Sequence, residues 1–277
     1  MPDFPTTTKV AEIARRNGQL TQGERFVPEE TPVAFSYAGS THAVMMATPA
    51  DLEDFAVGFS LTEGIIADPA EIEAVEVMAE DKGIDLQIRL VEARSDALTA
   101  RRRHMAGPVG CGLCGIESIE QAVRATPSVR SSTLTLTEAD VAETVRLLNG
   151  QQPMHMTTRA VHGAGFYLPG TGLVAVREDV GRHNALDKLA GAARRAGHPG
   201  GSGAVVVTSR VSVEMVQKTA IIGSPFIIAI SAPTALAIRT AEEAGMTLIA
   251  LVRGEEFEIF TGAERVASGA GRRLGNG

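Results

Sequence analysis

Two cysteines separated by two residues are the strongest chemical signal in the sequence. Cys111 and Cys114 lie in the glycine-rich run Gly110–Gly115, and the basic run Arg101–His104 comes shortly before them. Positive charge near a thiol favours the thiolate, which is the nucleophilic form. Glycine beside a thiol permits unusual backbone angles and lets another molecule approach the sulfur closely. These residues indicate a thiolate that can attack a sulfane sulfur, hold it as a persulfide and pass it on.

Other uses of a Cys-x-x-Cys pair stay open at this point. A structural zinc ion needs four ligands, of which this pair supplies two, and the sequence has no histidine pair at zinc-site spacing. A thioredoxin-like redox pair is a second alternative, and an iron–sulfur cluster usually takes more cysteines. Zinc deamination is excluded because it needs His-x-Glu followed by Pro-Cys-x-x-Cys. No histidine here has that glutamate, and Gly110 precedes Cys111.

A second group of polar residues occupies Glu178–Lys188. On a helix, His183 and Asp187 share a face, as do Asn184 and Lys188. One interpretation is a hydrogen-bonding rim for a polar ligand, with His183 among its members. The other is a surface helix with ordinary side-chain pairs, and the segment alone does not separate the two.

Three polar loops each follow an apolar segment in the last third of the chain. The apolar segments Ala204–Val207, Phe226–Ile230 and Thr247–Val252 alternate with helical patterns over Ser212–Ile222 and Thr234–Ala244. This alternation predicts parallel strands with covering helices, and ligands of such sheets bind beyond the carboxyl ends of the strands. The loops at those ends contain Thr208-Ser209-Arg210, Ser231-Ala232-Pro233-Thr234 and Arg253-Gly254-Glu255. Because a guanidinium pairs well with phosphate, Arg210 and Arg253 favour an anionic, nucleotide-like ligand.

Composition limits the class of protein. Of 277 residues, 44% are hydrophobic and 21% charged, which is typical of a globular chain. The formal net charge of −7 and the absence of Trp argue against nucleic acid or an anionic membrane as a partner. The uncharged run Thr219–Ile238 is long enough to span a bilayer, but its Gly, Ser and Pro residues predict a helix end, a buried strand and a new helix instead. Two cysteines and no secretory signal indicate a reducing, cytoplasmic location.

The residue patterns in the first half of the chain predict an α+β unit. Pro32–Tyr37 and His42–Met46 flank a turn and form a hairpin. A helix follows Thr48-Pro49-Ala50-Asp51, with Thr48 as its cap, and ends at Gly64. Ile84–Leu90 alternates like a strand.

The second half begins with a capping box at Thr137–Asp140, whose helix ends near Gly150. Strand-like segments at Ala160–Leu168 and Gly172–Arg177 precede a helix over Val180–Ala196. The predicted fold class is α/β, with a mixed sheet covered by helices and a smaller α+β domain before it. The predicted divisions are a flexible tail at 1–24, an α+β domain at 25–100, a connecting loop with both cysteines at 101–132, an α/β domain at 133–264 and a flexible tail at 265–277.

Taken together, these stretches resemble the FdhD family of formate dehydrogenase accessory proteins. The matching pieces span residues 27 to 264 in the family's order: Met46–Pro49 with Gly58–Gly64, Gly110–Gly115, Glu178–Lys188, Ser209–Lys218, Ser231–Thr234 and Leu251–Thr261. The chain departs from the family in two places: Arg159-Ala160 stands where Gly-Gly is common, and Leu251 and Phe260 stand where Phe and Tyr are common.

The resemblance implies a sulfurtransferase that takes sulfur from a cysteine desulfurase and delivers it to the molybdenum cofactor before the cofactor enters formate dehydrogenase. It implies that Cys111 carries the persulfide, with Cys114 as its neighbour, and that the segment Leu251-Val252-Arg253-Gly254-Glu255-Glu256 binds the bis(molybdopterin guanine dinucleotide) form of that cofactor. It also implies a cytidine-deaminase-like fold for the second domain, a homodimer, and no permanently bound metal. A cofactor-binding chaperone and a thiol oxidoreductase are the alternative functions.

Overall fold

The computed structural model describes residues 4–95, 98 and 125–268, which form two compact units. The first contains the chain up to residue 98 together with Gln152–His162 and Arg177–Gly191. The second contains residues 125–151, Gly163–Val176 and the described chain from Ala192 to residue 268. The predicted domains were each a continuous stretch of sequence, whereas two segments of the predicted α/β domain, Gln152–His162 and Arg177–Gly191, pack with the first unit. The reason is a set of long-range hydrogen bonds, such as those that join Thr48 to Asp179 and Val180.

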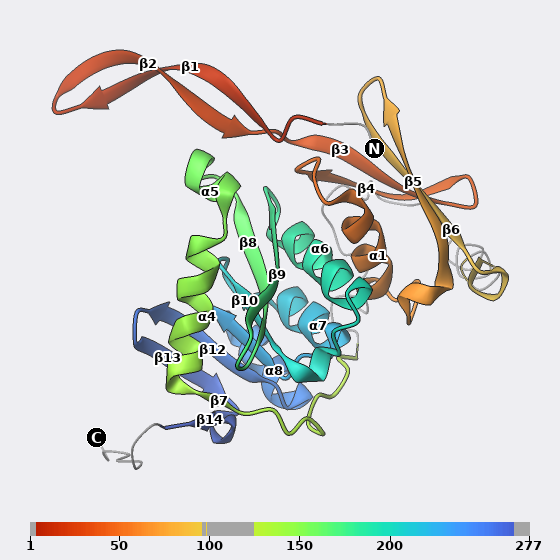
Figure 1. The fold of residues 1–277 in the computed structure, drawn as a ribbon, viewed down its shortest axis with the longest axis vertical. Coiled ribbons are helices and arrows are strands. Elements are labelled where there is room, and N and C mark those ends of the chain that lie inside the picture. Colours follow the sequence, from red (N-terminus) through yellow and green to blue (C-terminus); the bar gives the residue numbers. More distant parts are fainter. Residues whose placement is uncertain (1–3, 96–97, 99–124, 269–277) are drawn as a thin grey trace. The chain divides into compact units, whose positions relative to one another are not determined.

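The first unit is built on a four-stranded sheet and one covering helix (Figure 1). Its strands are β3 (Thr31–Tyr37), β4 (Ser40–Ala47), β5 (Ile72–Glu80) and β6 (Gly83–Leu90), in the order β4-β3-β6-β5. β3 runs parallel to β6, and the other two pairs are antiparallel. The predicted hairpin and the strand at Ile84–Leu90 are confirmed, while β5 was not predicted.

Helix α1 (Leu52–Thr62) closes the core of this sheet through aromatic contacts. The Phe35 ring centroid lies 4.9 Å from that of Phe55 and 4.0 Å from that of Phe59. The predicted cap at Thr48 is wrong: Asp51 is the N-cap, and it makes no side-chain cap hydrogen bond. The Thr48 hydroxyl instead accepts a hydrogen bond from the backbone N–H of Val180, 132 residues further along the chain.

A two-stranded antiparallel ribbon precedes the sheet (Figure 1). Its strands β1 (Thr7–Arg16) and β2 (Gln19–Pro28) replace most of the predicted N-terminal tail. The sequence did not predict this ribbon, because its strands lack the alternation of apolar and polar residues that marks a half-buried sheet. Most side chains on both faces of the ribbon are exposed. The turn uses Asn17 and Gly18, both with positive φ, as hairpin turns require.

The second unit contains a six-stranded mixed sheet. Its strands are β8 (His162–Leu168), β9 (Gly172–Asp179), β10 (Ala204–Val207), β11 (Phe226–Ala229), β12 (Thr247–Arg253) and β13 (Glu256–Thr261), in the order β13-β12-β11-β10-β8-β9. β10, β11 and β12 are parallel, as predicted. A short parallel pair, β7 (Leu136–Thr137) with β14 (Val266–Ala267), lies outside this sheet.

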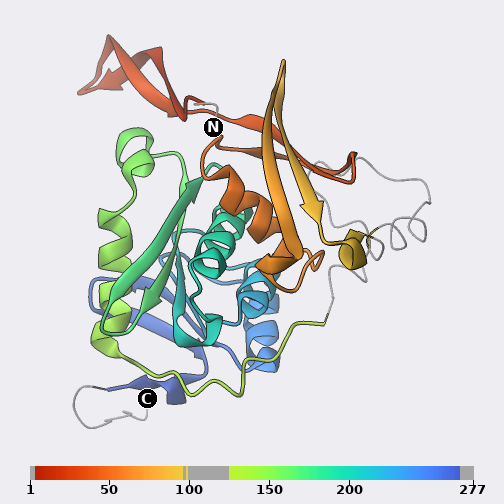
Figure 2. The same cartoon turned by 45° about the vertical axis from the view of Figure 1, so that its right-hand side comes forward.

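Helices cover both faces of the six-stranded sheet (Figure 2). Helix α4 (Glu138–Gly150) packs Val141, Val145 and Leu148 against one face, and α7 (Val213–Ile222) and α8 (Ala235–Ala244) lie on the other. The capping box at Thr137 and Asp140 is confirmed, with Thr137 Oγ1 accepting from the Asp140 N–H at 3.1 Å. The run Thr219–Ile238 forms the end of α7, strand β11 and the start of α8, as predicted. Among the described residues, no helix is long and apolar enough to cross a membrane.

The mixed α/β class is therefore confirmed, and the cytidine-deaminase-like assignment stays a prediction. Two further helices are α5 (Pro153–Thr158) and α6 (Arg182–Arg195), and short 3₁₀ turns occur at Pro69–Glu71, Gly200–Ser202 and Ala263–Arg265. Arg159, at one position where the sequence departs from the family, ends α5 with φ 59°, a conformation that glycine adopts without strain.

Candidate functional site

The predicted thiols, Cys111 and Cys114, lie in the segment 99–124, outside the described residues. Their proposed chemistry therefore depends on the sequence alone. The other predicted site residues are all described. They fall into two groups, one in each unit.

The first group lies at the carboxyl edge of β10, β11 and β12 in the second unit. The loops after β10 and β11 are hydrogen-bonded to each other through the backbone, and the loop after β11 is also bonded to the end of β12. Val211 N–H donates to Ala232 O at 3.2 Å, Thr234 N–H donates to Val211 O at 3.0 Å, and Leu251 N–H donates to Ser231 O at 3.4 Å. The sequence prediction that three polar loops meet at one rim of the sheet is confirmed.

Leu251 is the strained residue of this rim. Its φ is 57°, in the left-handed region that a branched side chain rarely occupies, and the β12–β13 register shifts between Ala250 and Arg253. Such backbone strain costs roughly 1–3 kcal/mol and is concentrated at functional sites in known proteins. The bulge lies within the segment Leu251–Glu256, which the family resemblance assigned to cofactor binding.

The charged residues at the rim differ in how they are held. Arg253 donates to the backbone carbonyls of Ile230 and Val252, which fixes its side chain across the β11 loop. Arg210 is exposed on the loop after β10, and Glu255 and Glu256 are exposed at the β12–β13 turn. Carboxylates repel a phosphate, so attraction for an anion at this rim would have to come from the two arginines and from backbone N–H groups.

The second group belongs to the first unit and is centred on Asp179, which is fully buried. One carboxylate oxygen, Oδ2, accepts from Thr48 N–H at 3.0 Å and from Lys188 Nζ at 2.6 Å. The other, Oδ1, accepts from Gly181 N–H at 2.8 Å and from Asn184 Nδ2 at 2.9 Å. A single carboxylate thus connects the β4–α1 loop to the start of α6.

Lys188 completes this network from within the core. It is 0% exposed, and its ammonium also donates to Thr48 O at 2.8 Å and lies 5.2 Å from the Phe55 ring centroid. The shared face of Asn184 and Lys188 was predicted correctly. The surface-helix interpretation is wrong for Asn184 and Lys188, because both side chains are buried and their polar groups bond within the network. The ligand-rim interpretation stays a prediction for His183.

Three basic side chains that were not among the predicted site residues lie near Asp179: His155, His162 and Arg182. Glu178 accepts hydrogen bonds from the backbone N–H groups of Met154 and His155 at 2.9 and 2.8 Å, which holds the start of α5 against the end of β9. His155 Nδ1 lies 3.2 Å from Val161 O, next to His162. The predicted ligand residue His183 follows Arg182 on α6 and is half-buried.

The surroundings of His162 lower the pKa of its imidazole. Burial lowers its pKa, and the positive charges of Arg182 and His155 lower it further, against an opposing effect of Asp179. The unfolded chain therefore binds this proton more readily than the folded chain. The stability that depends on His162 is complete above its unfolded pKa of about 6.5 and is lost as the pH falls from there through the lower folded pKa.

We expect the His162 imidazole to titrate at a higher pH in the Arg182→Gln variant than in the wild type, because the variant removes a nearby positive charge. Proton-detected NMR of the imidazole carbon-bound protons measures both midpoints. Arg15→Gln, on the exposed β1–β2 ribbon, is the matched control and should leave the midpoint unchanged. Equal midpoints in wild type and Arg182→Gln would show that Arg182 does not act on His162.

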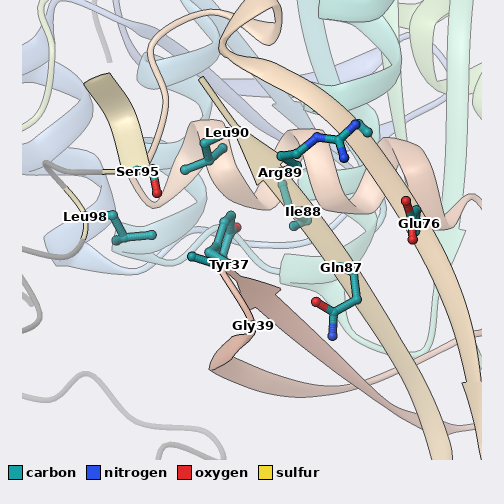
Figure 3. A pocket seen from close by; sticks show the side chains of 11 residues that line it. Tyr37, Gly39, Glu76, Gln87, Ile88, Arg89, Leu90, Ser95 and Leu98 are labelled. Carbon is teal, nitrogen blue, oxygen red and sulfur yellow. The ribbon is translucent and has the colours of Figure 1, made fainter. Parts of the chain in front are cut away.

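A cavity of about 280 Å³ lies beside the turn after β3 in the first unit (Figure 3). Its charged lining residues are Glu76 and Arg89, from β5 and β6, and Ser95 and Leu98 line it from the chain after β6. None of the predicted site residues contributes to it. Among the described residues, no group of three or more His, Cys, Asp or Glu side chains has the geometry to hold a metal ion.

Comparison with known proteins identifies relatives over nearly the whole chain. Residues 28–267 match the model of the FdhD/NarQ family. The chain is 66% identical over 258 residues to the sulfur carrier protein FdhD of Agrobacterium fabrum, covering 93% of this chain and 95% of the relative. It is 56% identical over 257 residues to the protein of the same name from Brucella abortus, covering 93% and 96%.

A solved structure agrees with these sequence matches. The crystal structure of a putative formate dehydrogenase accessory protein from Desulfotalea psychrophila superposes with a TM-score of 0.75 at 27% identity. The match covers 95% of this chain and 100% of that one.

Proposed function

The chain belongs to the FdhD/NarQ family, and from that premise we propose that it is a sulfur carrier in the maturation of formate dehydrogenase, with Cys111 as the sulfur-bearing residue. In this proposal Cys111 accepts sulfur from a cysteine desulfurase. It then passes the sulfur, at the oxidation level of sulfide, to the molybdenum cofactor before the cofactor enters the enzyme. In this step the Cys114 thiolate attacks the inner sulfur of the Cys111 persulfide, so that a Cys111–Cys114 disulfide forms and the outer sulfur leaves with the two electrons that the step requires. The sulfur carrier name of relatives at 66% and 56% identity is the observation that carries the general function. The Cys111–Cys114 pair, with its basic flank, supports the specific chemistry.

The acceptance step conserves atoms and electrons. The Cys111 thiolate attacks the terminal sulfur of a persulfide on the desulfurase, so that a new S–S bond forms while the donor's S–S bond breaks. The donor cysteine leaves as a thiolate, and the terminal sulfur is now held as Cys111-S-SH. No external oxidant or reductant is required, because the sulfane sulfur is transferred without a net change in oxidation state.

The cofactor is the cargo in this proposal, and the carboxyl edge of the second unit is its proposed binding region. Arg210 is exposed there, and Arg253 is held across the β11 loop by its backbone contacts. Two guanidinium groups near helix N-termini suit the diphosphates of a guanine dinucleotide. We include Leu251–Glu256 in the proposed cofactor contacts, and a homodimer, on the ground of family resemblance. His183 is included as a polar residue of the segment Glu178–Lys188, and a cytoplasmic location on the ground of the Cys-x-x-Cys pair.

Mass spectrometry after incubation with desulfurase and cysteine under anaerobic conditions tests the carrier role. We expect an adduct of about 32 Da on Cys111, lost in Cys111→Ala and removed by reducing agent. Cys114→Ala is the matched control, because it keeps the attacking thiolate and removes only its neighbour. Cells with Cys111→Ala in place of the wild type should lack formate dehydrogenase activity.

Three outcomes would redirect the proposal. If wild-type protein shows no adduct, the sulfur carrier role of Cys111 is wrong. Stoichiometric bound zinc that disappears in Cys111→Ala would favour a metal site. A Cys111–Cys114 disulfide that cycles with a dithiol substrate, without any adduct, would favour a thiol oxidoreductase.

A further inference from the structure

The ribbon formed by β1 and β2 presents three large apolar side chains to solvent. Ile13 is 69% exposed, Leu20 72% and Phe26 44%. The two strands pair with each other along their full length of ten residues, and within the described residues neither pairs with any other strand. An isolated two-stranded hairpin is only marginally stable in water. The ribbon therefore gains stability from any surface that covers its apolar side chains.

The pairing register places these three side chains on one face of the ribbon. Directly opposed residues of an antiparallel pair point to the same side, and side chains alternate along each strand. Ile13 lies opposite Gln22, and Leu20 is two residues before Gln22, so Ile13 and Leu20 are diagonal neighbours. Phe26 is four residues after Gln22 and points to the same side. We call this side of the ribbon its apolar face.

The opposite face turns toward the first unit at the base of the ribbon. Arg25 lies on that face, opposite Val10, and its Nη2 donates to Thr158 O of α5 at 2.9 Å. Arg16 and Glu12, also on that face, form an ion pair with an N···O distance of 3.1 Å. Because Arg25 holds the opposite face against α5, the apolar face is directed away from α5 and is open to another molecule.

The charge of the ribbon is opposite in sign to that of the rest of the chain. Residues 7–28 contain four basic and two acidic side chains, a net charge of +2, whereas the whole chain carries −7, which leaves −9 for the remainder. Lys9 pairs with Glu24 on the apolar face. Arg15 is exposed on the same face, and none of the described carboxylates is within ion-pair distance of it. An apolar face that carries an unpaired cation is complementary to an acidic surface.

Contact area distinguishes a second copy of this chain from an unrelated partner. Two ten-residue strands cover about 30 Å by 10 Å, or about 300 Å² on one face, given a rise of roughly 3.3 Å per residue and a strand spacing of roughly 4.8 Å. Covering this face once removes about 600 Å² from water, counting both surfaces, and a stable interface takes about 1,200–2,000 Å². A two-fold symmetric dimer forms the contact twice and buries about 1,200 Å². The symmetric pair therefore reaches the required size, whereas a single ribbon contact does not.

We propose that the apolar face of the β1–β2 ribbon binds a second copy of this chain, each ribbon lying on the acidic remainder of the other copy. Packing of the two apolar faces against each other is disfavoured, because it would bring Lys9 and Arg15 of both copies together. The inference rests on the homodimer included in the proposed function and names the surface that forms it. It requires neither a bound cofactor nor sulfur on Cys111.

Sedimentation equilibrium of the full-length protein over a range of concentrations tests the proposal. We expect the wild type to dimerise and the double variant Ile13→Thr with Leu20→Thr to raise the dimer dissociation constant by about 100-fold or more, because the symmetric contact buries four such side chains. Threonine keeps the preference for a strand. Val10→Thr, on the opposite face of the same strand, is the matched control and should dimerise as the wild type does.

The charge of the apolar face gives a second expectation. Dimerisation of the wild type should weaken as the sodium chloride concentration rises, because salt screens exposed charges. Arg15→Gln should weaken dimerisation at low salt by up to about 10-fold. Arg16→Gln is the control, since Arg16 is on the opposite face and already pairs with Glu12.

Hydrogen exchange of the wild type keeps the test valid if a variant folds poorly. The amides of β1 and β2 should exchange slowly at concentrations where the dimer forms and rapidly where the monomer prevails, because the uncovered ribbon is marginally stable. Ribbon exchange that does not depend on concentration would overturn the proposal.

The outcomes also separate this inference from the proposed function. A dimer whose dissociation constant is the same in the wild type and in the double variant would overturn the role of the ribbon and leave the homodimer intact. A wild type that stays monomeric would overturn both, while the Cys111 adduct tests the sulfur carrier role independently. If a monomeric wild type binds the cysteine desulfurase and the double variant does not, the desulfurase is the partner of the ribbon and the proposal is wrong.

Discussion

The Gly58→Ala variant is expected to lose about 3 kcal/mol or more of its free energy of unfolding, at the upper end of overpacking effects. Gly58 on α1 lies against the backbone of α6, and a Cβ atom at this position would be 1.7 Å from Asp187 O. The contact is reciprocal, since a Cβ on Gly191 would be 1.9 Å from Asp54 O. The obstacle on both sides is backbone rather than a flexible side chain, so the helices would have to separate.

Urea denaturation of Gly58→Ala and Gly191→Ala measures this loss, and Gly150→Ala is the matched control. Gly150 is the last residue of α4, and a Cβ there meets nothing within 4 Å. Alanine at an unhindered helical position should change stability by less than about 1 kcal/mol, usually toward higher stability. Because Gly58 and Gly191 share one crossing, their double variant should lose less than the sum of the single losses. Near-neutral effects at both sites would show that α1 and α6 are not in close backbone contact.

The Lys188→Met variant is expected to lose about 3–5 kcal/mol of stability, the range for removing one partner of a buried ion pair. Methionine fills a similar volume, but it leaves the buried carboxylate of Asp179 without its cationic partner. Thr48 N–H, Gly181 N–H and Asn184 would remain as hydrogen-bond donors, although none of them carries a compensating charge.

A double-mutant cycle with Asp179→Asn separates the ion pair from the rest of the network. The double variant should be more stable than the sum of the two single losses predicts, since it removes both charges together. Lys82→Met, at an exposed lysine in the β5–β6 turn, is the control and should change stability by less than about 0.5 kcal/mol. If Lys188→Met is as mild as Lys82→Met, Lys188 is not a buried charge in the folded protein.

The sequence identified most elements of the second unit because their signals are local. The apolar runs of β10, β11 and β12, the capping box before α4 and the helix patterns of α7 and α8 each depend on a few consecutive residues. The meeting of three loops at one rim also followed from the sequence, because parallel strands bring their carboxyl ends to one edge. Leu251 was included in the predicted segment, but its positive φ depends on the bulge between β12 and β13, which strand pairing decides.

The sequence by itself determined the Cys111–Cys114 pair, the mixed α/β class and the likeness to FdhD proteins, which depend on residue types and their order along the chain. The tertiary structure alone decided that Glu178–Lys188 packs with the first unit and that Lys188 is buried. It also brought His155, His162 and Arg182 together. The physical reason is that whether a polar helix face meets solvent or a buried carboxylate depends on contacts such as Thr48 with Asp179, 131 residues apart. Helical spacing is the same in both cases, so no local pattern distinguishes them.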